Sequence, residues 1–185
     1  MANILIVYAS DYGGTRKMAE ALAAGVQSAG GSAVLKEAEA ATLDDLVAAD
    51  GLALGSPVHM GSMDWRVKKF IDTVCSTAWM KNLAVGKAGA VFAAGSGFGN
   101  AGGGAELTLL GMLNNLAELG MVLLPLSKHQ GGYPKAGLQW GPYGRAHNED
   151  LSPKGLDEAQ LETSRTHGAN LARLAEILKH NKVFA

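Results

Sequence analysis

Short apolar runs recur along this sequence, and each is followed by a segment whose apolar residues repeat with helical spacing. Residues 4–8 form the first run, which is almost continuously apolar rather than alternating. Such a run is typical of a parallel strand that helices cover on both faces. After a turn at residues 10–14, Met18, Leu22 and Val26 share one face of a predicted helix that stops at Gly30. This part of the chain therefore predicts a strand, a loop and a helix in that order.

The same unit recurs until the chain has five of them, which predicts an α/β fold: a doubly wound, five-stranded parallel sheet with helices on both faces. In such sheets, ligands bind outside the carboxyl ends of the strands, near the point where the strand order reverses. The loops after the first, third and fourth strands are therefore the candidates for a site. The predicted strands are residues 4–8, 33–36, 51–54, 88–94 and 121–126, and the predicted helices start at 15, at 42, near 64, after 104 and near 157.

Residues 128–153 are rich in glycine, proline and aromatic residues and have neither the strand nor the helix period. We expect a long loop there, and loops of that length inside a compact domain are often functional.

Length, charge and cysteine content narrow the class of protein. A chain of 185 residues is long enough for one buried core, so we expect a single domain spanning residues 1–185. A net charge of −1 gives no long-range field for nucleic acid or anionic lipid. Cys75 is the only cysteine, so an internal disulfide is excluded and a reducing compartment fits. The simplest interpretation of Cys75 is a small buried hydrophobe. The first apolar run is too short to span a bilayer and has no basic segment before it, so we expect a cytoplasmic protein.

The loop at residues 10–15 combines the features of a phosphate site. The hydroxyls of Ser10 and Thr15 flank Gly13 and Gly14, and the loop leads into a helix N-terminus whose N–H groups are free. No lysine or arginine precedes Arg16, so a phosphate monoester fits better than a triphosphate. Thr15 as a simple N-cap in a glycine-rich turn is an equally good interpretation of the loop taken alone.

The loop after the third strand sets Pro57 beside Val58 and Met60. Such a segment can lie along the edge of a flat heterocycle, with backbone groups toward its polar rim and apolar side chains toward its ring. Taken singly, His59 is more typical of a partly exposed structural histidine, and Met60 of core packing.

The loop after the fourth strand contains Gly97-Phe98-Gly99-Asn100-Ala101-Gly102, which formally matches G-x-G-x-x-G. It follows the fourth strand rather than the first and lacks the acidic residue that a dinucleotide site needs about 20 positions on. We interpret this loop as a wall that closes over a ring, with Phe98 as a shield for that ring or as filler of a surface pocket.

Several other chemistries are not indicated. The chain has no P-loop and no nucleophile elbow. Its five histidines show neither H-x-x-x-H nor H-E-x-x-H spacing, so we expect no metal site. A receiver domain shares the five-unit fold and a lysine after strand five, as Lys128 is here, but it needs acidic residues where this chain has Tyr8-Ala9-Ser10 and Gly55-Ser56-Pro57.

Taken in order, these motifs resemble the flavodoxin superfamily, and within it the WrbA-type NAD(P)H:quinone oxidoreductases. Residues 10–15 resemble the S/T-x-x-G-x-T phosphate loop, and residues 55–63 resemble the segment G-[ST]-P-x-x-x-G-x-M. The resemblance covers nearly the whole chain and implies the strand order 2-1-3-4-5. Further similar segments are Phe70-Ile71-Asp72, Trp79 ahead of Gly86-Lys87, Gly120-Met121-Val122, and Pro142-Tyr143-Gly144.

The resemblance implies FMN as the cofactor, with hydride transfer from NADH or NADPH to flavin N5 and two-electron transfer to a quinone or a similar small molecule. The chemistry would then belong to the flavin, and no side chain would itself be catalytic. It implies a substrate pocket that includes Trp79, Leu119 and Tyr143, with Leu119 where the family carries a site histidine. The expected FMN-binding residues are Ser10, Tyr12, Gly13, Gly14, Thr15, Pro57, Val58, His59, Met60, Gly61, Ser62, Ala94, Gly95, Ser96, Gly97, Phe98 and Gly99.

The resemblance also implies a homo-oligomer, either a dimer or a tetramer, although the connection after the second strand lacks an insertion that helps to build the family's tetramer. The alternative function is a flavodoxin-type electron carrier without nicotinamide turnover of its own. Such carriers are usually strongly acidic, which steers them to basic partners, and the net charge of −1 favours the enzyme.

Overall fold

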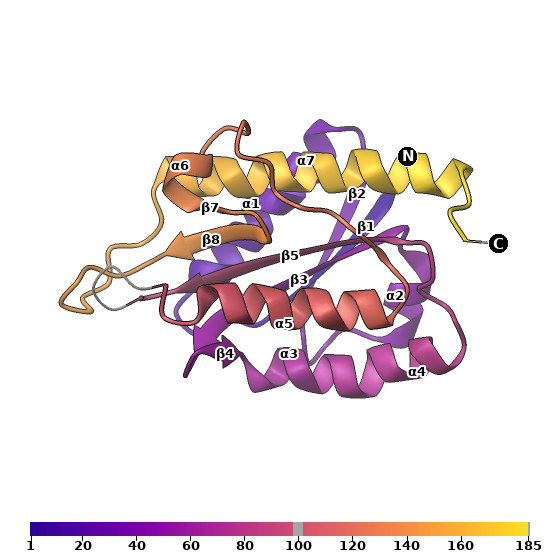
Figure 1. Cartoon of the computed structure of the whole chain (residues 1–185), viewed down its shortest axis with the longest axis horizontal. Coiled ribbons are helices and arrows are strands. Elements are labelled where there is room, and N and C mark those ends of the chain that lie inside the picture. Colours follow the sequence, from indigo (N-terminus) through magenta and orange to yellow (C-terminus); the bar gives the residue numbers. More distant parts are fainter. Residues whose placement is uncertain (98–101, 185) are drawn as a thin grey trace.

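The computed structural model describes residues 1–97 and 102–184. Four parallel strands form the centre of its sheet, in the order β2-β1-β3-β5 (Figure 1). This order confirms the doubly wound α/β fold, because the chain passes from β1 outward to β2 and then returns across β1 to β3. The strands are β1 (Asn3–Tyr8), β2 (Ser32–Glu37), β3 (Gly51–His59) and β5 (Ala88–Gly95).

The position of the fifth strand is filled by two separate pieces. β6 (Val122–Leu123) pairs with the start of β5, and β8 (Gly141–Arg145) pairs with its end. Between them the chain forms α6 (Tyr133–Ala136) and β7 (Gly137–Leu138), which pairs antiparallel with β8.

The predictions of one strand over residues 121–126 and of an irregular loop over 128–153 are therefore wrong. Leu126 donates its N–H to the carbonyl of Gln139 in the inserted segment rather than to β5. β8 reads Gly-Pro-Tyr-Gly-Arg, a composition with little intrinsic strand propensity, so its place in the sheet comes from tertiary pairing.

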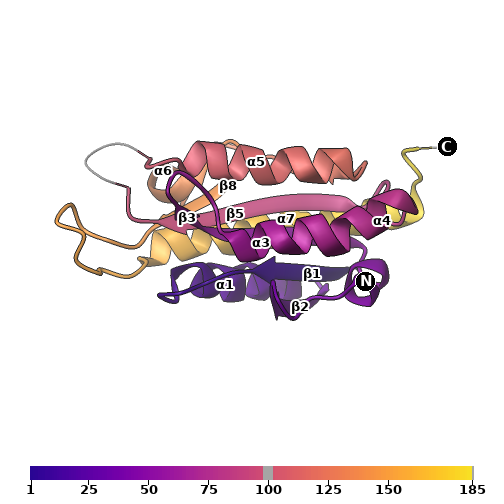
Figure 2. The same ribbon diagram turned by 90° about the horizontal axis from the view of Figure 1, so that it is seen from below.

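Helices cover both faces of the sheet (Figures 1 and 2). One face carries α1 and α7, and the other carries α2, α3, α4 and α5, as their buried side chains in two separate clusters indicate. The predicted helices are confirmed within a few residues. Their bounds are α1 (Gly14–Ser28), α2 (Leu43–Ala48), α3 (Trp65–Phe70), α4 (Ser76–Met80), α5 (Ala105–Glu118) and α7 (Glu158–His180).

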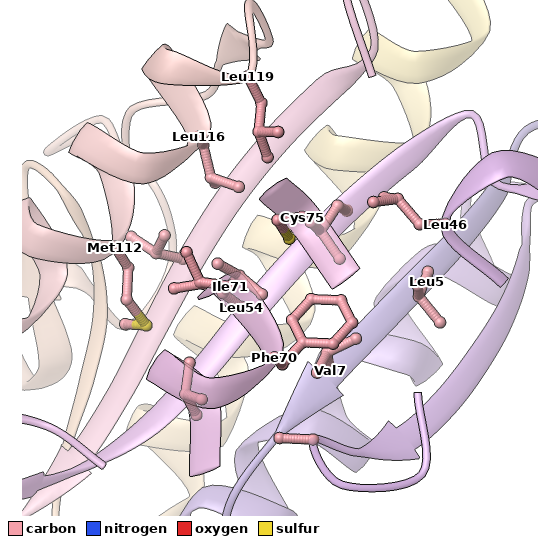
Figure 3. Close-up of a cluster of buried hydrophobic side chains, with 14 of the residues drawn as sticks. Leu5, Val7, Leu46, Leu54, Phe70, Ile71, Cys75, Met112, Leu116 and Leu119 are labelled. Atoms are coloured by element: carbon pink, nitrogen blue, oxygen red, sulfur yellow. The ribbon is translucent and has the colours of Figure 1, made fainter. Parts of the chain in front are cut away.

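A single π-helical turn, Ile71–Cys75, joins α3 to α4 and turns Ile71 and Cys75 toward the core (Figure 3). Phe70 packs beside them against residues of β1 and β3. Burial raises the pKa of the Cys75 thiol to about 12, so the group stays protonated and unreactive. Cys75 is thus the buried hydrophobe that its sequence context indicates.

Helices α1 and α7 approach each other closely at two glycines. A side-chain carbon on Gly25 would overlap the carbonyl of Arg165, and one on Gly168 would overlap the carbonyl of Leu22. The two helix backbones therefore touch where neither residue has a side chain.

Lys87, immediately before β5, caps the C-terminal end of α2. Its ammonium donates to the carbonyls of Leu46, Val47 and Ala49 at 2.9, 2.8 and 2.7 Å. Carbonyl groups at the C-terminal end of a helix have no N–H partner within the helix, and the ammonium of Lys87 supplies donors for these three. Burial lowers the pKa of Lys87.

We expect Lys87→Met to lower the free energy of unfolding by about 1 to 2 kcal/mol, because it removes a charged donor from partly buried acceptors. Urea unfolding measures this loss. Lys81→Met, which removes an exposed lysine, is the control, and equal stability of the two variants would contradict the capping role.

Candidate functional site

A cleft with a volume of about 490 Å³ opens at the carboxyl ends of β1, β3 and β5. It is the place that the topology of the sheet predicts for a ligand. Its lining includes these predicted residues from all three loops: Ser10, Tyr12, Gly13, Gly14, Thr15, Pro57, Val58, His59, Ala94, Gly95 and Ser96.

The first loop leaves its hydrogen-bond donors free for a ligand. Gly13 has φ of +83°, a left-handed conformation that glycine adopts without strain, and it precedes the first turn of α1. The Ser10 hydroxyl accepts from the N–H of Arg16 at 3.3 Å. The N–H groups of Gly14 and Thr15 and the Thr15 hydroxyl donate to no residue that the structure describes. Thr15 lines the cleft although it is only 2% exposed.

Four charged or titratable side chains tie the first loop to the start of α3. Arg66 donates to the carboxylates of Asp64 and Asp11, each at 2.8 Å. The two ring nitrogens of His59 lie 3.0 Å from Asp64 and 3.4 Å from Asp11. Asp64 also caps α3 by accepting from the N–H of Arg66. The group therefore holds two walls of the cleft together.

Burial of Asp64 opposes its ionisation, but the bonds from Arg66 and the nearby His59 outweigh that cost and hold the pKa of the carboxyl below its ordinary value. The bond to Asp64 in turn raises the pKa of Arg66. Asp11, His59 and Asp64 lie close enough to share a cation, but Arg66 already supplies the positive charge to both carboxylates.

The second loop is a β-hairpin that the sequence did not indicate. β3 extends to His59, Met60 and Gly61 form the turn with positive φ, and β4 (Ser62–Met63) pairs back on β3. Met60 is fully exposed at the tip. Met60, Gly61 and Ser62 are therefore outside the cleft lining, although they were predicted to contact the cofactor.

The third loop is held by the last residue of β8 and by the two residues that follow it. Arg145 donates to the carbonyls of Ser96 and Gly97, both at 2.9 Å, and the N–H of Ala146 donates to Gly95 at 3.0 Å. The His147 ring lies 3.1 Å from the Ser96 hydroxyl. Gly97 is described but does not line the cleft, and Phe98 and Gly99 lie outside the described residues.

Residues 146–156 form a fourth wall that no motif in the sequence indicates. His147 meets the Tyr12 ring edge to face, with 6.4 Å between ring centroids. The prediction that 128–153 would be functional is the nearest signal, but it named no residue of this wall. The additional lining residues are Asp11, Lys17, Ala146, His147, Leu151, Pro153, Gly155 and Leu156.

The three residues expected in the substrate pocket are not brought together. Tyr143, in β8, lies beside Gly95 and has a buried hydroxyl with no partner among the described residues, and burial raises its pKa. Trp79 lies in the last turn of α4 and Leu119 directly follows α5, and these ends of the two helices lie toward the amino ends of the strands, away from the cleft (Figure 1). Leu119 is buried in the core, whereas Trp79 is 51% exposed.

The strand order and the cleft at its switch point define a doubly wound α/β protein with a ligand-sized cleft at the carboxyl ends of its strands. A family model described as Flavodoxin domain matches residues 5–86. The chain is 36% identical to a protein of Aquifex aeolicus named Flavodoxin, across 96% of this chain and 89% of that protein. It is 31% identical to an NAD(P)H dehydrogenase (quinone) of Paraburkholderia phymatum, across 95% and 98%.

Among solved structures, the flavodoxin, WrbA-like protein from Agrobacterium tumefaciens is similar with a TM-score of 0.74 and 27% identity, across 96% of this chain and 99% of that one. The chain therefore belongs to the flavodoxin family, and the resemblance seen in its motifs is confirmed. Across the described residues, no helix is both long and apolar enough to cross a membrane.

Proposed function

We propose that this chain is a single FMN-binding domain acting as an NAD(P)H:quinone oxidoreductase. The observation that carries the FMN assignment is the loop at residues 10–15. A nearly buried Thr15 hydroxyl and the N–H groups of Gly14 and Thr15, all without protein partners among the described residues, face a cleft at a helix N-terminus. One phosphate monoester satisfies these donors.

The other walls suit a flat ring. Pro57, Val58 and His59 present a rigid, partly apolar edge on one side, and Ala94, Gly95 and Ser96 leave room on the other because their side chains are small or absent. When bound, FMN supplies the acceptance of hydride and the donation of electrons. The chain binds the phosphate, orients the ring and excludes water from part of it.

Binding of FMN and FAD to the purified protein, followed by fluorescence quenching, tests the cofactor assignment. The fit of one phosphate to the first loop predicts a preference for FMN. Equal affinity for the two flavins would contradict it.

Nicotinamide and quinone turnover is supported by the named relatives and by charge. The relative of Paraburkholderia phymatum carries that activity in its name and matches over almost its full length. A net charge of −1 offers little steering toward a basic protein partner. The alternative, a flavodoxin-type electron carrier, is favoured by the relative of Aquifex aeolicus named Flavodoxin. A carrier would take electrons from a partner reductase and would not itself oxidise NADH or NADPH.

Thr15→Val should weaken FMN binding by about 1.5 to 3 kcal/mol, the usual value of a hydrogen bond to a charged group, because valine keeps the shape and removes the hydroxyl. The dissociation constant, from fluorescence titration, should rise about 10-fold or more. Thr73→Val, on the exposed side of the π-helical turn, is the matched control. Unchanged FMN affinity in Thr15→Val would place the phosphate elsewhere.

The exposed Trp79 supports a homo-oligomer in which a neighbouring chain completes the site. Met80 beside it is also exposed, and Trp79 lies away from the cleft of its own chain. We expect Trp79→Ala to keep FMN bound while lowering quinone turnover at least tenfold, since hydride transfer depends on close stacking. Turnover and analytical ultracentrifugation check this. A fully active monomer, or an unaffected Trp79→Ala, would exclude the shared site.

A further inference from the structure

A phosphate monoester carries close to two negative charges near neutral pH. The donors of the first loop are neutral, so the charged groups around the cleft decide how much of that charge is balanced. The candidates for this balance are the cationic side chains of Arg16 and Lys17 in the first turn of α1, Arg66 at the start of α3, and Lys154 in the segment 146–156.

Two of these cations already have carboxylate partners. Arg16 turns away from the cleft, with its guanidinium 3.9 Å from Glu20 and 3.6 Å from Glu37. Arg66 is held by Asp64 and Asp11. A ligand would therefore compete with these carboxylates for either guanidinium.

Lys17 differs from Arg16 and Arg66 both in its position and in its lack of a carboxylate partner among the described residues. It lines the cleft, and its ammonium forms no ion pair with any residue in 1–97 or 102–184. The backbone N–H of Lys17 donates to the carbonyl of Gly13 at 3.0 Å. Lys17 therefore lies in the first turn of α1, two residues after Thr15. The nearly buried, unpartnered hydroxyl of Thr15 on the same wall marks where a ligand oxygen would be bound.

We propose that Lys17 is the counter-cation of the phosphate in the bound flavin and gives this chain a charge-dependent preference for FMN over riboflavin. The proposal rests on the proposed function, because it assigns the phosphate to the loop at residues 10–15. Asp11 shares the rim, but Arg66 and His59 occupy its carboxylate, which leaves the charge of Lys17 uncancelled.

The test is titration of flavin-free protein with FMN and with riboflavin, at low and high NaCl, by fluorescence quenching. Lys17→Met should raise the dissociation constant for FMN about 10-fold at low salt, flatten its salt dependence, and leave riboflavin binding unchanged. Lys154→Met removes a positive charge from the segment 146–156 at a residue that does not itself line the cleft, and Arg16→Met removes one from the residue before Lys17. Both should bind FMN within about twofold of the parent.

Three results would overturn the assignment: FMN affinity of Lys17→Met equal to the parent, an equal loss for riboflavin, or an equal loss in Lys154→Met. Failure of the parent to bind FMN would instead refute the proposed function. The two failures are therefore distinguishable, since the first set requires a parent that binds FMN.

Discussion

Gly25→Ala is expected to lower the free energy of unfolding by more than about 3 kcal/mol, although alanine is the better helix former. The added methyl would overlap the backbone carbonyl of Arg165, and a backbone atom cannot rotate away as a side chain can. Relief requires α1 and α7 to separate. That movement would open the cluster of Met18, Leu22 and Leu171 on this face of the sheet.

Urea unfolding of the parent and of Gly25→Ala measures the loss. Gly111→Ala is the matched control, because Gly111 lies in α5 and an added methyl would meet only the flexible end of Met63 at 3.2 Å. We expect Gly111→Ala to be neutral or stabilising by up to about 1 kcal/mol. Similar stabilities for the two variants would mean that α1 and α7 do not cross at Gly25.

Acidification should destabilise the fold through His167. The free energy of unfolding should fall by about 3 kcal/mol once the pH is below the pKa of His167 in the folded chain. His167 is fully buried on α7, and both ring nitrogens lack partners among the described residues. Burial lowers its pKa from 6.5 to about 4. The unfolded chain therefore binds a proton below about pH 6.5 that the folded chain does not accept until about pH 4, so stability is lost across that window as the pH falls.

Urea unfolding of the parent and of His167→Leu from pH 8 to pH 4 isolates this effect, since carboxylates titrate equally in both. The variant should lose less stability on acidification, and at pH 8 it should be at least as stable, because leucine leaves no buried polar atom unpaired. His180→Gln, which removes an exposed histidine, should follow the parent. Parallel curves for the parent and His167→Leu would contradict the assignment.

The parts of the fold that follow from local patterns were predictable. The continuous apolar runs at residues 4–8 and 88–94 are typical of strands buried on both faces, and they form β1 and β5. The first loop was also predictable as a cleft wall, because it follows the first strand of a doubly wound sheet, where ligands bind. Its assignment to a phosphate stays a prediction.

The parts that depend on distant partners were not predictable. β8 pairs with β5 despite its two glycines and a proline, and no period in the sequence signals it. The turn at Met60 and Gly61 places a methionine at positive φ, which propensity disfavours, so the hairpin was missed. His147 and Lys17 enter the cleft through the packing of residues 146–156 and α1, and a single sequence does not reveal such contacts.

The measurement that tests the central claim most directly is the steady-state oxidation of NADH and of NADPH by FMN-loaded protein with benzoquinone as the acceptor. An NAD(P)H:quinone oxidoreductase should oxidise at least one nicotinamide with saturation kinetics, and the rate should depend on quinone and disappear when FMN is removed. FMN-loaded protein that oxidises neither nicotinamide, yet exchanges electrons with a reductase, would contradict the enzyme assignment and establish the electron carrier.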